Sequence, residues 1–241
     1  MGRAKSRAGI LVETVAAMLF NRFAPKLAIA GATAAGLTLP DMPLLHRTYL
    51  AFASVLVLIG WLRWRSEGMA QFGLVVPRRW LALIGFGIAL ALAQIVLDSL
   101  VRSVTTPLIV AWTGADPHLD AKTFAAIEGN LDLYLMILPC VWLFAAFGEE
   151  FLYRGYLMTR LSQLLGGGRA AWALAIIGQA VLFALAHWYQ GPVGMVPIGI
   201  GAVLTGIATL AWGRNLWPAM IAHGLTDTLG FTLLYLGKPL S

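Results

Sequence analysis

The chain alternates between long apolar stretches and short connections that hold most of its charge. The apolar stretches recur at roughly the length that crosses about 30 Å of hydrocarbon. They lie at 48–62, 80–100, 170–188, 194–212 and 217–236, with another that starts near 131 and runs through Glu149, and with weaker segments at 9–22 and 27–45. This pattern predicts an all-α, polytopic membrane helix bundle of about six to eight transmembrane helices.

The amino-acid composition is also typical of an integral membrane protein. Of the 241 residues, 59% are hydrophobic and only 12% are charged, and the mean hydropathy is +0.79. Soluble domains carry about twice that share of charge. No repeat, low-complexity tract or linker divides the chain, so we expect residues 1–241 to form a single integral membrane domain.

The net charge of +6 comes from basic residues that stand singly or in pairs between the apolar stretches. This scatter disfavours nucleic acid as a partner and favours contact with membrane lipid headgroups. The connections at 63–79 and 160–169 and the position of Arg214 are basic, so we expect them to face the cytoplasm. The longer, mixed-charge connection at 103–130 is expected on the other side of a multi-pass protein of the cell membrane.

Two adjacent carboxylates, Glu149 and Glu150, interrupt an apolar run and are followed by Arg154. Adjacent residues of an α-helix point about 100° apart, whereas residues four apart are neighbours. We therefore expect Glu150 to pair with Arg154 and Glu149 to face elsewhere without that counter-ion, as suits a general base acting on water. A structural ion-pair cluster is the alternative, but ionisable groups in an apolar span favour a functional interpretation.

Pro139 lies inside the run that starts near 131. It predicts a kink or restart, with a helix over about 140–164 that ends at Gly166. Counting about 1.5 Å per residue from this turn gives depths of roughly 25 Å for Glu149 and 27 Å for His187. Adjacent antiparallel helices would therefore bring these two side chains to a similar level.

Two later apolar stretches also carry polar side chains. His187 shares a helical stripe with Phe183, although an interfacial histidine in the aromatic belt is an equal alternative. His223 and Asp227 are four residues apart, so the carboxylate can accept a hydrogen bond from the imidazole and fix its tautomer. A structural polar bridge between helices is the alternative for this pair.

Other candidate chemistry is sparse. The chain has no His-Glu-x-x-His motif and no Gly-x-Ser-x-Gly motif, which argues against the usual zinc protease and serine hydrolase signatures. Cys140 precedes Glu149 by about two and a half α-helical turns, so it is expected to point away as a packing residue. Asp98 and Arg102 are expected to form a local surface pair near a helix end.

Three motifs on separate apolar helices now form an ordered set. They are Glu149-Glu150-x-x-x-Arg154, Phe183-x-x-x-His187 and His223-x-x-x-Asp227. Together they resemble the CPBP family, the CAAX-protease and bacteriocin-processing (Abi) group of intramembrane proteases. The resemblance covers a core of about residues 130–236, and it departs from the family at Asp227, where Asn is frequent.

The resemblance implies a helical intramembrane protease in which Glu149 activates water. It implies further that His187, His223 and Asp227 bind or polarise at the scissile carbonyl, and that Glu150, Arg154 and Phe183 support the site. The predicted substrate is a hydrophobic or lipid-modified, CAAX-type prenylated peptide or protein that is cleaved within or at the edge of the membrane.

Metal use and two other functions stay open at this point. Glu149, His187, His223 and Asp227 are candidate ligands for a divalent metal such as Zn²⁺, but no cofactor is assigned, since the family has been described both as metalloproteases and as glutamate-dependent enzymes. The alternative function is a non-catalytic bacteriocin-immunity or scaffolding membrane protein. A third is a small transporter with a midplane ion site, although the chain lacks a clear inverted repeat.

Overall fold

The computed structural model describes residues 6–37 and 43–238, except for the side chains of residues 43–47, 120 and 121. Its described elements are all helical, which confirms the predicted fold class. The longer helices are α1 (Arg7–Ala34), α2 (Pro43–Trp64), α3 (Trp80–Thr113), α5 (Leu131–Cys140), the π-helix η3 (Val141–Leu157), α6 (Met158–Leu164), α7 (Arg169–Ala186), α8 (Gly191–Ala211) and α9 (Trp217–Tyr235). Short helices are η1 (Met69–Phe72), α4 (Leu119–Thr123), η2 (Ala125–Ile127) and η4 (Trp188–Gln190).

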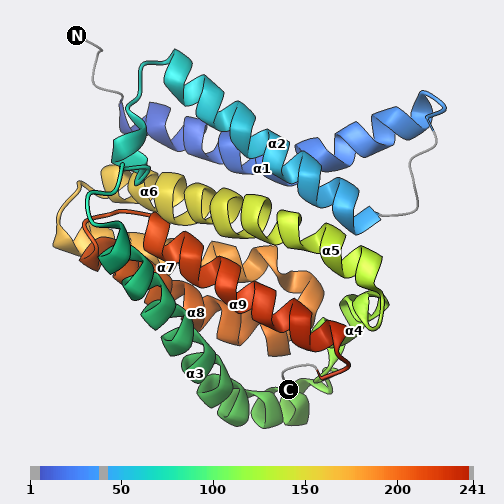
Figure 1. Ribbon diagram of the computed structural model, residues 1–241. Coiled ribbons are helices and arrows are strands. Elements are labelled where there is room, and N and C mark those ends of the chain that lie inside the picture. Colours follow the sequence, from blue (N-terminus) through green and yellow to red (C-terminus); the bar gives the residue numbers. More distant parts are fainter. Residues whose placement is uncertain (1–5, 38–42, 239–241) are drawn as a thin grey trace.

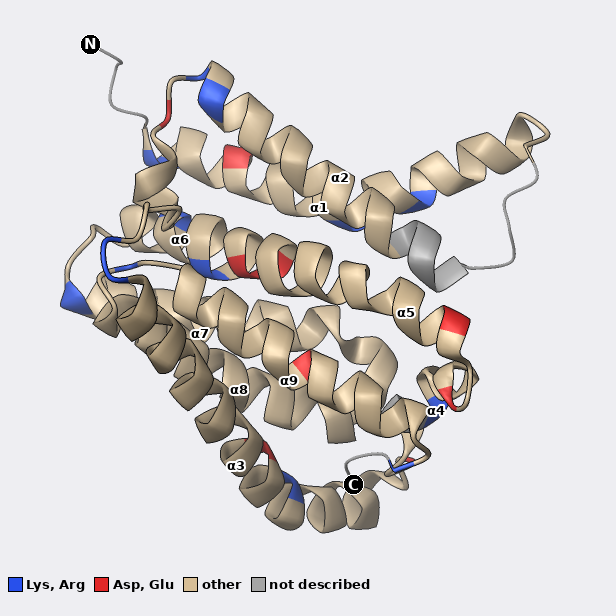
Figure 2. Cartoon of the chain, viewed as in Figure 1, with Lys and Arg blue, Asp and Glu red and all other residues tan. Residues whose placement is uncertain are grey.

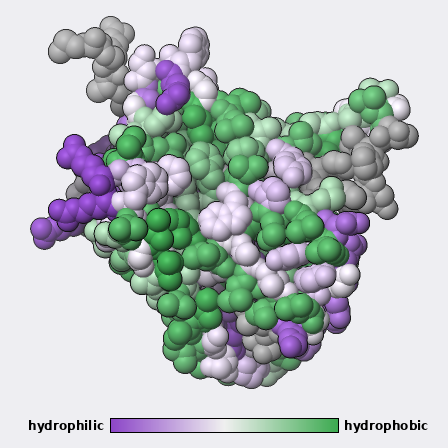
Figure 3. Space-filling view, viewed as in Figure 1, coloured by the Kyte–Doolittle hydropathy of each residue, from purple (hydrophilic) through white to green (hydrophobic). Residues whose placement is uncertain are grey.

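Four helical stretches of the described chain are long and apolar enough to cross a membrane. They are Trp80–Thr113, Leu131–Leu164, Arg169–Ala186 and Trp188–Ala211, and Thr48–Trp64 is a shorter apolar helix. The face in Figure 3 is largely hydrophobic, with hydrophilic residues gathered mainly at its left and right edges. A multi-pass integral membrane protein fits both observations.

The continuous helix formed by α5, η3 and α6 lies in the middle of the bundle (Figure 1). Helices α1 and α2 pack on one side of it, and α7 and α9 pack on the other, with α3 and α8 beyond them. Phe151 and Tyr156 of η3 are fully buried. Because η3 is covered on both sides, its polar residues lie inside the protein rather than against lipid.

The basic connections gather at one end of the bundle, as the charge pattern predicts. The backbone N–H of Leu216 donates to the carbonyl of Gly73 (3.1 Å), and the indole N–H of Trp217 donates to the carbonyl of Val75 (3.0 Å). Figure 2 shows several Lys and Arg residues at this left end. Its orientation toward the cytoplasm remains a prediction.

The sequence suggests that Arg160 is an exposed residue of a turn, but the structure buries it. It lies in α6 with only 3% of its side chain exposed, and it contacts carboxylate oxygens of Glu13 and Glu67, both at 2.7 Å. A guanidinium that is shut off from water needs such partners. The cluster therefore ties α1 and the segment after α2 to the central helix.

The central helix continues through Pro139 without the predicted restart. Instead, the hydrogen-bonding pattern changes directly after Cys140, where the π-helix η3 begins. In a π-helix each N–H bonds to the carbonyl five residues earlier, so the turns are wider than in an α-helix. All three polar residues of the first motif lie on this wider helix.

Gly155 permits the closest approach of η3 to its surroundings. A Cβ at this position would lie 2.6 Å from the backbone oxygen of Phe72 and 3.0 Å from a methyl group of Leu216. A backbone oxygen cannot rotate away as a side chain can. Gly155 thus sets how tightly η1 and the start of α9 pack on η3.

We expect Gly155→Ala to lower the free energy of unfolding by about 1–3 kcal/mol, the usual range for overpacking a core. Gly60→Ala in α2 is the matched control, because a Cβ at Gly60 meets nothing within 4 Å. Thermal unfolding in detergent measures both variants. Equal melting temperatures for the two would show that this close approach does not limit packing.

Candidate active site

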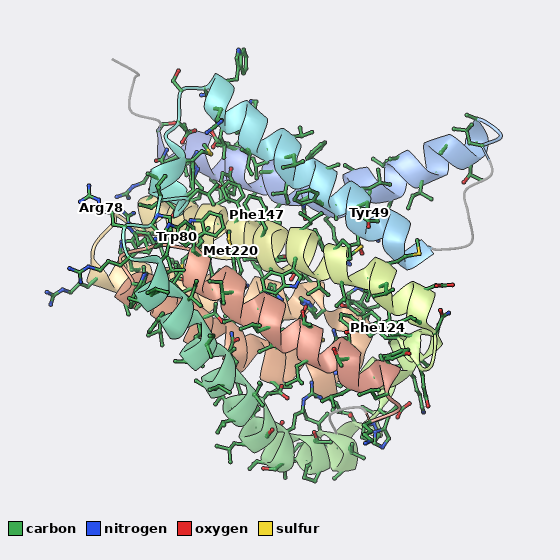
Figure 4. All side chains as sticks on the ribbon, viewed as in Figure 1. Tyr49, Arg78, Trp80, Phe124, Phe147 and Met220 are labelled. Atoms are coloured by element: carbon green, nitrogen blue, oxygen red, sulfur yellow. The ribbon has the colours of Figure 1, made fainter. Side chains whose placement is uncertain are left out.

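A cavity of about 580 Å³ lies between η3 and helices α3, α7, α8 and α9. At the α4 end it is bordered by Phe124, whose ring packs edge-on against Phe231 at 5.3 Å and is labelled in Figure 4. The wall includes all seven residues that the sequence assigns to the site. These are Glu149, Glu150, Arg154, Phe183, His187, His223 and Asp227.

Glu150 is the most enclosed acid of the cavity, with 1% of its side chain exposed. Its Oε1 lies 3.2 Å from Nη1 of Arg154, so the predicted ion pair is present. The same oxygen lies 2.7 Å from Nδ1 of His223. Glu150 therefore joins η3 to α9 as well as to its own helix.

His223 has a defined orientation because of this contact. With Nδ1 donating to the Glu150 carboxylate, Nε2 faces the other two acids, 3.5 Å from Oδ2 of Asp227 and 4.0 Å from Oε2 of Glu149. Gly224 lets α9 come this close, since a Cβ there would lie 2.6 Å from the ring of Trp142. The sequence suggests Asp227 as the residue that fixes the imidazole, but the structure places Glu150 closer.

Glu149 occupies a different position from its neighbour. Its carboxylate lines the cavity with 14% exposure, and its distance of 4.0 Å from His223 Nε2 is too long for a hydrogen bond. The Arg154 contact is made by Glu150 and not by Glu149. The structure thus separates the two acids as the sequence predicts, one fixed by a cation and one facing the cavity.

Phe183 and His187 form the α7 side of the cavity. Nδ1 of His187 donates a hydrogen bond to the carbonyl of Phe183 (2.8 Å), and this bond fixes the orientation of the ring. The other ring nitrogen, Nε2, is not used by this bond. The Phe183 ring lies 4.2 Å from the guanidinium of Arg154 and 6.3 Å from the ring of His223. Phe183 therefore packs between the cation and both histidines, which suits the supporting role implied for it.

Comparison with known proteins adds an independent observation. Residues 131–229 match the family model for Rce1-like proteins, described as type II CAAX prenyl endopeptidase Rce1-like. This stretch is similar to the Rce1-like family. The match confirms the predicted relation to the CPBP and CAAX-protease family, and it spans every site residue named above. No curated protein and no solved structure matched the chain.

The four candidate metal ligands, Glu149, His187, His223 and Asp227, all line the cavity. Among the described side chains, no group of three or more His, Cys, Asp or Glu residues has an arrangement that could hold a metal ion. Nδ1 of His187 is bonded to a carbonyl and Nδ1 of His223 to Glu150. The four metal candidates line one cavity, but within the described residues they are not grouped as a ligand set; both histidines keep Nε2 as the nitrogen that a metal could bind, since metal-binding histidines commonly give Nδ1–H to such partners.

Three features of the site were missed from the sequence. The Glu150–His223 contact joins residues 73 apart, and no spacing rule points to it. Cys140 lines the cavity together with Glu149, because wide π-helical turns return residues nine apart to a similar face. Asp98 and Arg102 do form a pair (2.9 Å), but on the cavity wall and within α3.

Arg154→Ala should lower the free energy of unfolding by about 3–5 kcal/mol, since it leaves the Glu150 carboxylate buried without its cation. Folded yield and thermal unfolding in detergent measure this loss. Arg169→Ala removes an exposed arginine at the first position of α7 and serves as the control. An unchanged melting temperature in Arg154→Ala would contradict a structural role for the ion pair.

Proposed function

We propose that this protein is an intramembrane endopeptidase in which Glu149 activates the attacking water. The match of residues 131–229 to the Rce1-like family model supports peptidase activity in general. The observation that carries the proposed mechanism is the separation of the two acids. Glu150 is held by Arg154 and His223, and Glu149 faces the cavity that both histidines line.

The chemistry assigned to Glu149 is general-base catalysis. The carboxylate takes a proton from a water molecule while the water oxygen attacks the scissile carbonyl carbon. When the carbon–nitrogen bond breaks, the same proton passes to the leaving amine. The products are a new carboxyl group and a new amine, and Glu149 returns to its ionised form.

The histidines and Asp227 are assigned to the carbonyl side of the reaction. Nε2 of His223 lies within 4.0 Å of both Glu149 and Asp227, so a carbonyl between them would meet the base and the imidazole together. Because Nδ1 of His223 already donates to Glu150, Nε2 donates to the developing oxyanion when the ring is the imidazolium, the form that carries N–H on both nitrogens. Glu150, Arg154 and Phe183 act by holding these groups in place.

The proposed substrate is a hydrophobic or prenylated, CAAX-type peptide in the membrane. Alongside the polar groups, the cavity wall carries apolar side chains such as Ile95, Ile137 and Phe144. The four helices that are long and apolar enough to span a membrane support a site surrounded by lipid, which a lipid-modified peptide would reach laterally. We propose the cell membrane as its location.

Glu149→Gln should abolish cleavage of such a peptide, with a loss of at least about 10²–10⁴ in rate, because the amide cannot accept the proton from water. The measurement is peptide cleavage by purified protein in detergent or liposomes. Glu128→Gln, an exposed acid near α5, is the control and should keep full activity. Cleavage retained by Glu149→Gln would rule out the mechanism.

His223→Ala should also abolish cleavage, and it should leave the protein less stable because Glu150 loses its partner across the helix interface. Leu225→Ala, at an exposed position of the same helix outside the cavity, provides a control for changes in α9. The cleavage rate and the melting temperature of His223→Ala are both measured and compared with those of wild type. A folded His223→Ala protein that cleaves at the wild-type rate would remove the histidine from the reaction.

We expect cleavage to persist in the presence of a metal chelator, because a carboxylate base activates water without a Lewis acid. The assay compares wild type with and without chelator, and then after addition of Zn²⁺. Loss of activity with chelator and its return with Zn²⁺ would instead establish a metalloprotease.

A further inference from the structure

A second hollow of the molecule lies between α1 and α2, which run side by side in Figure 1. It is a groove of about 730 Å³, and it shares no residue with the cavity that holds Glu149. Its wall is mostly apolar and includes Val12 and Phe20 of α1 and Val57 of α2. The proposed mechanism makes no use of this groove.

The groove has about the length of one leaflet of a bilayer. Along α1 its lining residues run from Ala8 to Phe20, which is about 18 Å at about 1.5 Å per residue. Along α2 they run from Val57 to Arg65, just after the helix ends, which is about 12 Å. The hydrocarbon core is about 30 Å thick, so one leaflet accounts for about 15 Å. The groove therefore fits a fatty acyl chain of a single leaflet.

A cation lies at the polar end of the groove. Arg65 is exposed directly after α2, and its guanidinium is 5.2 Å from the ring of Trp61, which also lines the groove. Among the described residues of the groove wall, Arg65 is the only cation. Tryptophan and arginine together are typical of the level where hydrocarbon meets headgroups. A guanidinium there can bind a phosphate through paired hydrogen bonds.

The acid of the groove wall faces away from this end. Oε1 of Glu13 contacts Nη2 of Arg160 in α6 at 2.7 Å, and only 9% of the Glu13 side chain is exposed. Arg63 and Arg65 are exposed, and Figure 2 shows basic residues at this end of α2. The surface that meets the headgroups is therefore positive, which favours an anionic lipid.

We propose that this groove binds one molecule of an anionic phospholipid, with an acyl chain between α1 and α2 and the phosphate at Arg65. Anionic lipids are concentrated in the cytoplasmic leaflet, which matches the predicted orientation of the basic end. The inference goes beyond the proposed function, since the groove is separate from the catalytic cavity. The bound lipid holds α1 and α2 together beside Arg160, whose contacts attach them to the central helix.

The test measures lipid binding to purified protein by native mass spectrometry. Phosphatidylglycerol is the anionic lipid, and phosphatidylcholine with the same acyl chains is the zwitterionic one. Wild type should bind one phosphatidylglycerol about fivefold more tightly, the scale for one arginine near a charged headgroup. Arg65→Gln should bring the two lipids to about equal affinity. Added phosphatidylglycerol should also raise the melting temperature of wild type, because a ligand that binds only the folded state stabilises it.

Two matched pairs of variants separate the headgroup contact from the chain contact. Arg78→Gln changes an exposed arginine outside the groove, labelled in Figure 4, and should keep the preference for phosphatidylglycerol. Ala16→Phe should weaken binding of both lipids about tenfold, because the ring takes the place of the acyl chain and removes its van der Waals contacts. Ala28→Phe, at an exposed position of α1 outside the groove, should bind both lipids as wild type does.

Equal binding of the two lipids by wild type, or a preference that survives in Arg65→Gln, would overturn the inference. Unchanged binding in Ala16→Phe would do the same. These readouts need no cleavage, so they are independent of the proposed peptidase activity. If Ala16→Phe instead raised the KM for a lipid-modified peptide and left phospholipid binding unchanged, the groove would receive the lipid of the substrate, and the inference would be wrong.

Discussion

The site depends on one carboxylate oxygen, Oε1 of Glu150, which contacts Arg154 on its own helix and His223 on α9. In an interior with little water, a buried carboxylate or guanidinium without its partner is strongly destabilising, so these contacts fix the relative position of the two helices. That relation sets the position of Asp227, one turn further along α9. It also leaves Glu149, the adjacent acid, facing the cavity.

Much of this arrangement follows from local spacing. The ion pair between Glu150 and Arg154 was predictable because both residues lie on one helix, four positions apart, and the pair persists although the helix is of the π type. The apolar stretches likewise predicted the helices, since length and hydropathy are the properties that a bilayer requires. The resemblance of the three motifs to the CPBP family then implied which polar residues share the site.

Other parts could not be predicted because they depend on helix type and on packing between helices. The sequence was interpreted with α-helical turns, which is why Cys140 was placed away from Glu149. Contact between Glu150 and His223 requires knowledge of how α9 lies on η3, and so does the position of Asp98 and Arg102 on the cavity wall. Irregular helical turns of this kind are frequent at functional sites, and here the π-helix carries the proposed base.

The most direct test of the account is cleavage by purified protein in water enriched in ¹⁸O, followed by mass spectrometry of both products. Hydrolysis activated by Glu149 predicts one ¹⁸O atom in the new C-terminal carboxyl group with wild type and no product with Glu149→Gln. A product without ¹⁸O, or labelled product from Glu149→Gln, would contradict the central claim that Glu149 activates water for hydrolysis at this cavity.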